Sequence, residues 1–217
     1  VTSREDCGDI VYLDMTVIAK EVWKTRLGDL REQCIHYLNI DPVKEVVPAL
    51  PGAHYFMGGI YVDEAHRSSM KNLYAAGECA CQYHGANRLG GNSLLGAIYG
   101  GKVAAESVMK SLDNNNNKTE KADDKAEKVS SKTASFISET LRKSLPIIRN
   151  EEDMLQAKNS LEAELKGNIN NAEKRRINLA LAMVMSALNR KESRGAHKRL
   201  DYPHTSEKFR KASIAKF

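Results

Sequence analysis

The stretch AHYFMGGIYVDEAHRSSMKNLYAAGECACQYHGANRLGGNSLLGAIYGGKVAAE, residues 53–106, decides how the 217-residue sequence is interpreted. It contains nine of the fourteen glycines of the chain, far more than its share of the length. Four polar side chains interrupt its apolar runs: His54, Glu78, His84 and Arg88. Glycines that alternate with polar and apolar residues indicate either a series of turns or a binding site.

Residues 72–78 predict a short buried strand that ends in a glycine turn, and the apolar spacing of residues 92–111 predicts a helix. This helix is rich in Gly and Ala, so it can lie close against a sheet or a ligand. The stretch therefore predicts the order strand, glycine-rich loop, small-residue helix.

The start of that helix can bind an anion, because its free backbone N–H groups and its dipole favour negative charge. Glu78 stands at the end of the predicted strand, where a carboxylate can accept hydrogen bonds from sugar-type hydroxyls. The guanidinium of Arg88 can bind a carboxylate with two parallel hydrogen bonds, and His54 lies in a second glycine-flanked loop. Structural roles stay open: glycine pairs make turns, His54 and His84 can pack within the protein, and Arg88 can be a surface charge.

Composition limits the possible classes of protein. A hydrophobic fraction of 41% supplies a core, and a net charge of +5 concentrated after Lys118 indicates a solvated basic surface rather than nucleic-acid binding. The cysteines form no C-x-x-C pair and the histidines lack metal-ligand spacing, so we expect reduced thiols, a cytosol-like compartment and no metal site. The cysteines are Cys7, Cys34, Cys79 and Cys81. No apolar run approaches the length of a membrane span.

The rest of the chain predicts mainly helix. Residues 17–38 show helical spacing with Thr16 as N-cap, whereas the three prolines that follow, at 42, 48 and 51, require extended or irregular backbone. Residues 112–133 are low in complexity and predict a mobile linker or surface insertion. Residues 134–190 predict three antiparallel helices, with a break at Pro146.

Several motifs resemble the flavoprotein subunits of the succinate dehydrogenase and fumarate reductase family, with the L-aspartate oxidases as close relatives. They are DPVKEVVPALP, PGAHYFMGGIYVD, NLYAAGECA, HGANRLGGNSLLGAIYGG and ESRGAHKRLDYP, in that order. The resemblance implies an α+β fold in which part of an FAD-binding α/β domain, with a capping-domain remnant, precedes a helical, three-helix-bundle-like C-terminal domain. The implied ranges are 1–50 for the capping remnant, 51–111 for the FAD-binding part, 112–133 for the linker and 134–217 for the helical domain.

The resemblance also implies roles for individual residues. His54 and Arg88 match positions that bind the substrate carboxylates. Glu78 matches a contact with the ribityl or ribose hydroxyls of FAD, and Ser93 and Leu94 match backbone positions beside the isoalloxazine ring or ribityl chain. The implied reaction interconverts succinate and fumarate by hydride transfer at flavin N5.

Other parts of the family pattern are missing. The sequence has no G-x-G-x-x-G fingerprint, no counterpart of the histidine that carries covalent flavin, and no counterpart of the proton-shuttling arginine, expected upstream of DIVYLDMT. Because the chain also begins with Val1, we expect the C-terminal part of a longer subunit, inactive alone. The resemblance implies an iron–sulfur partner subunit, no direct membrane span, and a cytoplasmic location, peripheral at the inner face of the membrane through partner subunits.

Three alternatives remain. The first is an L-aspartate oxidase, although RLGGNSLL is more similar to the succinate and fumarate branch. The second is an assembly module in which residues 134–217 dock an iron–sulfur protein. The third concerns ESRGAHKR alone, which is either surface charge at the end of a helix or a structural segment near the flavin domain.

Overall fold

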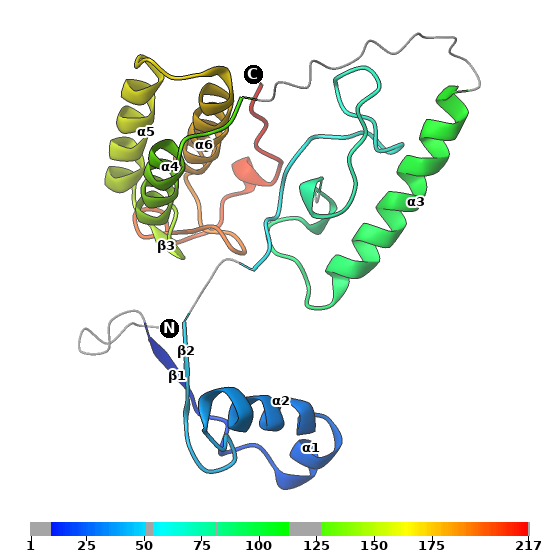
Figure 1. Ribbon diagram of the computed structural model, residues 1–217, viewed down its shortest axis with the longest axis vertical. Coiled ribbons are helices and arrows are strands. Elements are labelled where there is room, and N and C mark those ends of the chain that lie inside the picture. The colour runs from blue at the N-terminus through cyan, green and yellow to red at the C-terminus, as the bar shows by residue number, and fades with distance from the viewer. Residues whose placement is uncertain (1–9, 51–53, 81, 113–126, 217) are drawn as a thin grey trace. The chain divides into compact units, whose positions relative to one another are not determined.

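A computed structural model describes four stretches of the chain: residues 10–50, 54–80, 82–112 and 127–216. They form two compact units, Val1–Tyr55 and Phe56–Phe217, drawn in Figure 1 and described separately below. Most of the predicted linker at 112–133 lies outside the described residues, as do Cys7 and Cys81.

The first unit is a two-stranded antiparallel sheet with short helices in the connection between its strands. β1 (Val11–Leu13) pairs with β2 (Val47–Ala49), and Tyr12 lies opposite Pro48. The extended backbone expected around the prolines is therefore confirmed for this part. Between the strands lie α1 (Lys20–Thr25), α2 (Gly28–Gln33) and the π-helical turn η1 (Cys34–Leu38).

The single helix predicted over residues 17–38 is wrong, because the backbone leaves helical geometry around Leu27, between α1 and α2. Thr16 does not cap it. Its backbone N–H and its hydroxyl both donate to Asp14 Oδ1, at 3.1 and 2.6 Å, and α1 begins only after Ala19. Thr16 therefore takes part in a local Asx-type turn with Asp14 and does not act as the predicted N-cap.

The second unit begins with the glycine-rich stretch, which holds the 3₁₀ turns η2 (Gly77–Cys79) and η3 (Gln82–His84) and the helix α3 (Asn92–Leu112). Helix α3 confirms the prediction. The strand predicted at 72–78 is wrong, since only Tyr74 makes a bridge, to Arg67. Asn72 and Gly77 adopt φ values of 64° and 73°, so the chain turns at both ends of the run.

The small residues of α3 allow it to lie directly on η2 and the loops beside it. Gly77 faces Ala97, and a methyl group added at Gly100 would lie 2.7 Å from Cε1 of the buried His66. A methyl group at Gly96 would lie 2.9 Å from the Tyr83 ring. The close approach expected for this helix therefore exists, but against turns and aromatic rings rather than a sheet.

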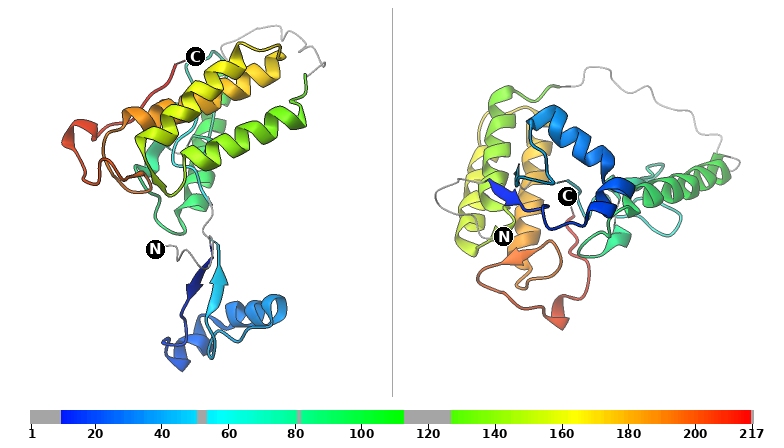
Figure 2. Two further views of the ribbon diagram at one scale, coloured as in Figure 1. Left: turned by 90° about the vertical axis from the view of Figure 1, so that its left-hand side faces the viewer. Right: turned by 90° about the horizontal axis from the view of Figure 1, so that it is seen from below.

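The second part of this unit is the predicted set of three helices: α4 (Ser131–Ser144), α5 (Glu151–Leu165) and α6 (Asn171–Asn189). They lie side by side in both views of Figure 2. Pro146 follows the end of α4 as expected, because proline cannot continue a helix. Each helix has a side-chain N-cap, from Ser130, Asn150 and Asn170 respectively.

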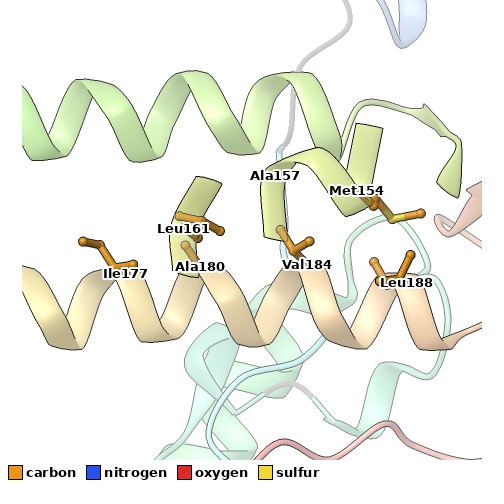
Figure 3. Packing of buried hydrophobic residues seen from close by; sticks show 8 residues of the cluster. Met154, Ala157, Leu161, Ile177, Ala180, Val184 and Leu188 are labelled. Atoms are coloured by element: carbon orange, nitrogen blue, oxygen red, sulfur yellow. The ribbon is translucent and has the colours of Figure 1, made fainter. Parts of the chain in front are cut away.

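The core of the bundle lies between α5 and α6, where the apolar side chains of each helix point toward the other (Figure 3). Its buried members are Met154, Ala157, Leu161, Ile177, Ala180, Val184, Ala187 and Leu188. Phe136 and Leu141 of α4 pack against this cluster. Burial of large aliphatic side chains stabilises a fold by about 1.5–3 kcal/mol each, so this cluster stabilises the second unit strongly.

The chain leaves α6 into a compact C-terminal segment. β3 (Ile148–Arg149) and β4 (Lys198–Arg199) form a two-residue parallel pair, and η4 (Glu207–Phe209) is a single turn. The buried Arg199 donates to the carbonyls of Ala187 and Leu188 and forms an ion pair with Asp201, so it caps the end of α6. Among the described residues the fold is mostly helical, with small sheets.

Candidate functional site

The candidate site centres on residues 85–91, here called the glycine loop, which lead into α3. Arg88 is half-buried, and its Nη1 donates to the carbonyl of Leu89 at 3.1 Å. Glu78 lies in η2 and is exposed, and its Oε1 accepts the backbone N–H of Phe56 at 3.0 Å. Ser93 is half-buried in the first turn of α3, whereas Leu94 is 67% exposed.

His54 belongs to the first unit, where it is exposed. The other four candidate residues belong to the second unit. The structure therefore brings together Glu78, Arg88 and the start of α3 in one unit, and the pairing of His54 with Arg88 stays a prediction.

The glycine loop has room for a ligand on its backbone. Methyl groups added at Gly85, Gly90 or Gly91 would meet no atom of the described chain within 4 Å, and Gly85 and Gly91 have positive φ values. An exposed carboxylate can accept hydrogen bonds from hydroxyl groups, and a guanidinium can bind a carboxylate. The first amides of a long helix can bind an anionic group. The chemistry of these groups fits the polar parts of a flavin dinucleotide.

Two rings that lie against α3, those of Tyr83 and His66, were not singled out from the sequence. The hydroxyl of Tyr83 lies 3.2 Å from the carbonyl of Gly96 and 3.4 Å from that of Gly77, so it ties η2 to α3. His84 packs edge-on against Tyr83, which agrees with the packing role left open for it. The glycines of α3 predict that something packs closely against the helix, but they do not say which side chains do so.

The C-terminal segment also contacts the glycine loop. The backbone N–H of Ala196 donates to the carbonyl of Ala86 at 3.0 Å. Surface charge is the wrong interpretation of ESRGAHKR, because Glu192 and Arg199 are 0% and 2% exposed. The segment packs inside the second unit, next to the loop that carries Arg88.

Two ionisable groups of this segment are strongly influenced by their surroundings. Burial alone would raise the pKa of Glu192, but hydrogen bonds from Arg194, the backbone of Ser206 and Arg190 outweigh it and lower the pKa to about 2. Burial lowers the pKa of His197, and the nearby charges of Arg149 and other arginines act in the same direction. Glu192 is therefore an anion and His197 a neutral ring at neutral pH.

Other classes of site find no support in the part of the chain that is described. No group of three or more His, Cys, Asp or Glu side chains is placed there to hold a metal ion. Cys34 and Cys79 are free thiols. None of the described helices has the length and apolarity needed to cross a membrane.

Comparison with known proteins shows which class of protein the chain resembles. Residues 2–94 match the model of the FAD binding domain, and residues 174–217 match that of the fumarate reductase flavoprotein C-terminus. The chain is thus related to FAD-dependent flavoproteins through both its glycine-rich and its helical parts. It belongs to the family of succinate dehydrogenase and fumarate reductase flavoproteins and L-aspartate oxidases.

Individual relatives come from more than one branch. The fumarate reductase flavoprotein subunit of Serratia sp. is 33% identical over 89% of this chain and 38% of its own length. The L-aspartate oxidase of Pyrococcus furiosus is 38% identical over 95% of this chain and 42% of its own length. The solved E. coli quinol fumarate reductase matches with a TM-score of 0.70 and 29% identity, over 92% of this chain and 40% of the other. The chain spans about 40% of the length of these relatives, and they do not separate succinate or fumarate from aspartate as the substrate.

Proposed function

We propose that the chain forms part of the flavin and dicarboxylate site of an FAD-dependent oxidoreductase that interconverts succinate and fumarate. The observation that supports this proposal most is the glycine loop, with open backbone and the half-buried Arg88, at the start of α3 in the same unit as Glu78. Two separate parts of the chain match models of this family, the FAD binding domain and the flavoprotein C-terminus, which adds support for a flavoprotein.

The cofactor contacts are proposed for three residues. The exposed carboxylate of Glu78 would accept hydrogen bonds from hydroxyls of FAD, since its bond from Phe56 uses only one of about four acceptor positions. The backbone at Ser93 and Leu94 would lie beside the isoalloxazine ring or ribityl chain, where the helix dipole favours negative charge. When bound, FAD supplies hydride chemistry at N5.

The substrate contacts are proposed for Arg88 and His54. A guanidinium binds a carboxylate with two charge-assisted hydrogen bonds, and an imidazole can hold the second carboxylate. Together they would fix the carbon atoms of the dicarboxylate and stabilise charge that develops on its carboxylates. A proton must also leave or join the adjacent carbon, and no residue of the chain is assigned to that step. We therefore expect the 217-residue chain alone not to turn over substrate.

A chimaera tests the proposal. In it, this chain replaces the matching region of the Serratia fumarate reductase flavoprotein, and succinate-dependent dye reduction and fumarate-dependent oxidation of a reduced viologen are measured. We expect Arg88→Met to lower kcat/KM about 10- to 150-fold, because charge-assisted hydrogen bonds contribute about 1.5–3 kcal/mol.

Arg67→Met is the matched control, since Arg67 is an exposed arginine of the same unit paired with Asp63. It should leave kcat/KM within about twofold, since surface ion pairs contribute little. Equal losses in both variants would remove the carboxylate role of Arg88. Turnover by the isolated 217-residue chain with added FAD would overturn the expectation that it is inactive alone.

L-aspartate oxidation is the second candidate function, favoured by the 38% identity to the Pyrococcus furiosus enzyme. Reduction of the bound flavin by L-aspartate but not by succinate would establish this alternative.

We also propose an iron–sulfur subunit as the electron partner, with the protein at the cytoplasmic face of a membrane through its partners. Pull-down with the full chain as bait tests this partner. Failure to retain any iron–sulfur protein would contradict it.

A further inference from the structure

We propose that residues 194–197, here called the C-terminal turn, position the glycine loop and through it Arg88, and that Gly195 permits this contact. This inference rests on the proposed function for the role of Arg88, but the contact itself does not. The glycine loop and the C-terminal turn lie in the same unit.

The contact between the two segments is tight. Ala196 N–H donates to the carbonyl of Ala86 at 3.0 Å, and Gly195 lies so close that any Cβ there would overlap that same carbonyl group. Gly195 also has φ 57°, a conformation that side chains disfavour. Only glycine meets both conditions without displacing the backbone of Ala86.

The C-terminal turn is itself rigid. Arg194 and His197 exchange two backbone hydrogen bonds, of 2.8 and 3.0 Å. Arg194 Nε donates to the fully buried Glu192 at 3.0 Å, and Glu192 also accepts from Arg190 at 2.6 Å and from the backbone of Ser206 at 2.8 Å. This network fixes the side of the turn that precedes Gly195.

The other side of the turn is fixed by His197. Its Nε2 lies 3.0 Å from the carbonyl of Arg190, which can only accept, so Nε2 carries the proton. Its Nδ1 lies 2.8 Å from Nη1 of Arg149 and accepts from it. Because these bonds hold the C-terminal turn on both sides, a side chain at position 195 would displace the glycine loop rather than the turn itself.

The expected consequence falls on Arg88, two residues after Ala86. A shift of about 1 Å in a positioning element can cost about 100-fold in a reaction that depends on orientation. Glu78 does not contact the C-terminal turn through any described hydrogen bond. A displaced glycine loop should therefore weaken dicarboxylate binding much more than FAD binding, whereas general unfolding would weaken both.

The test uses the full chain and the FAD-loaded chimaera described above. Gly195→Ala adds both a Cβ and φ strain, and Gly195→Asn adds the same Cβ in a residue that tolerates positive φ. Gly101→Ala is the matched control, because a Cβ there meets nothing within 4 Å. Hydrogen exchange of the Ala196 amide, which donates to the carbonyl of Ala86, is measured in the chain. The affinity for malonate, a non-reacting dicarboxylate, and the retention of FAD are measured in the chimaera.

We expect both Gly195 variants to speed exchange of the Ala196 amide by about 5- to 150-fold, since strain of about 1–3 kcal/mol would weaken its bond to Ala86. Malonate affinity should worsen about tenfold or more and kcat/KM for succinate about 10- to 100-fold, with FAD retention changed by about threefold at most. Gly101→Ala should change neither exchange nor malonate affinity.

Unchanged exchange of the Ala196 amide in both Gly195 variants would overturn the inference. An effect of Gly195→Ala alone would show that φ strain, and not overlap with Ala86, is the cause. Faster exchange without any malonate binding by the unaltered chimaera would leave the contact standing and refute the proposed function. If Gly195→Ala does not fold, His197→Asn, which can keep the bond from Arg149 but loses that to Arg190, gives the same readout. No increase in exchange in that variant would also overturn the inference.

Discussion

The bundle of α4, α5 and α6 and the helix α3 are both regular, but they bury their residues in different ways. Met154, Leu161, Ile177 and Val184 of the bundle are 0% exposed. In α3 the residue that is buried is Gly100, whereas Leu95, like its apolar neighbours, is 66% exposed. The bundle is stabilised by large side chains that fill a core. In α3, glycines leave room for the aromatic rings and turns that pack against the helix.

Removal of a large side chain should separate the two regions most clearly. Leu161→Ala should lower the free energy of unfolding by about 2–5 kcal/mol, because it leaves a cavity between α5 and α6. Leu95→Ala, the same change at an exposed site in α3, should stay within about 0.5 kcal/mol of the unaltered chain. Urea unfolding followed by far-UV circular dichroism measures both. Equal losses would show that α3 packs against apolar surface as the bundle does.

Addition of a methyl group should give a smaller effect, of opposite sign at adjacent residues of α3. Gly100→Ala places a Cβ 2.7 Å from Cε1 of His66, and overpacking costs about 1–3 kcal/mol, partly offset by about 1 kcal/mol of helix propensity. Gly101→Ala meets open space and should stabilise the chain by about 0.5–1 kcal/mol. Thermal unfolding of the two variants measures the difference. A gain in both would mean that His66 moves aside without cost.

Acid should affect the bundle through the caps of its helices, with the smallest effect of the three. Hydrogen bonds from Ser130, first its hydroxyl at 2.6 Å, and from Asn170 and Thr133 lower the pKa of Glu173 to about 2. Because the folded pKa lies below the unfolded value of about 4.5, this stabilisation is complete above pH ~4.5 and is lost as pH falls toward 2. The difference in unfolding midpoint between the unaltered chain and Glu173→Gln should therefore shrink over this range.

The control for this titration is Glu64→Gln, which removes an exposed carboxyl group of the same unit. It gives the background effect of losing one carboxyl group. A constant difference between Glu173→Gln and the unaltered chain from pH 5 to pH 2.5 would contradict the assignment to Glu173.

The sequence predicts the bundle well because its signals are local. Apolar spacing and the break at Pro146 both act within a few residues. The strand expected at 72–78 was wrong because a strand needs a partner, and the turns at Asn72 and Gly77 leave only Tyr74 in position to pair. The break near Leu27 was missed because the helical spacing continues across it, although Gly28 stands at the break.

The candidate site was predictable in part for the same reason. The glycines at the start of α3, with Glu78 and Arg88, stand in one stretch of sequence, and the structure keeps them in one unit. The contact between Ala86 and Ala196 could not be predicted, because nothing local links two residues more than a hundred positions apart. The burial of Glu192 was hidden as well, since a charged residue near a helix end usually faces solvent.

The hydrogen bond from Ala196 to Ala86 also sets an order of events during protein synthesis. At about 5–20 residues per second, a ribosome needs on the order of 10 s to advance from the glycine loop to the C-terminal turn. Throughout this time the nascent loop lacks the contact that holds Ala86, even after α3 has formed. The glycine loop thus gains this contact only after the C-terminal turn has been synthesised, and premature termination before residue 196 would leave Ala86 without it.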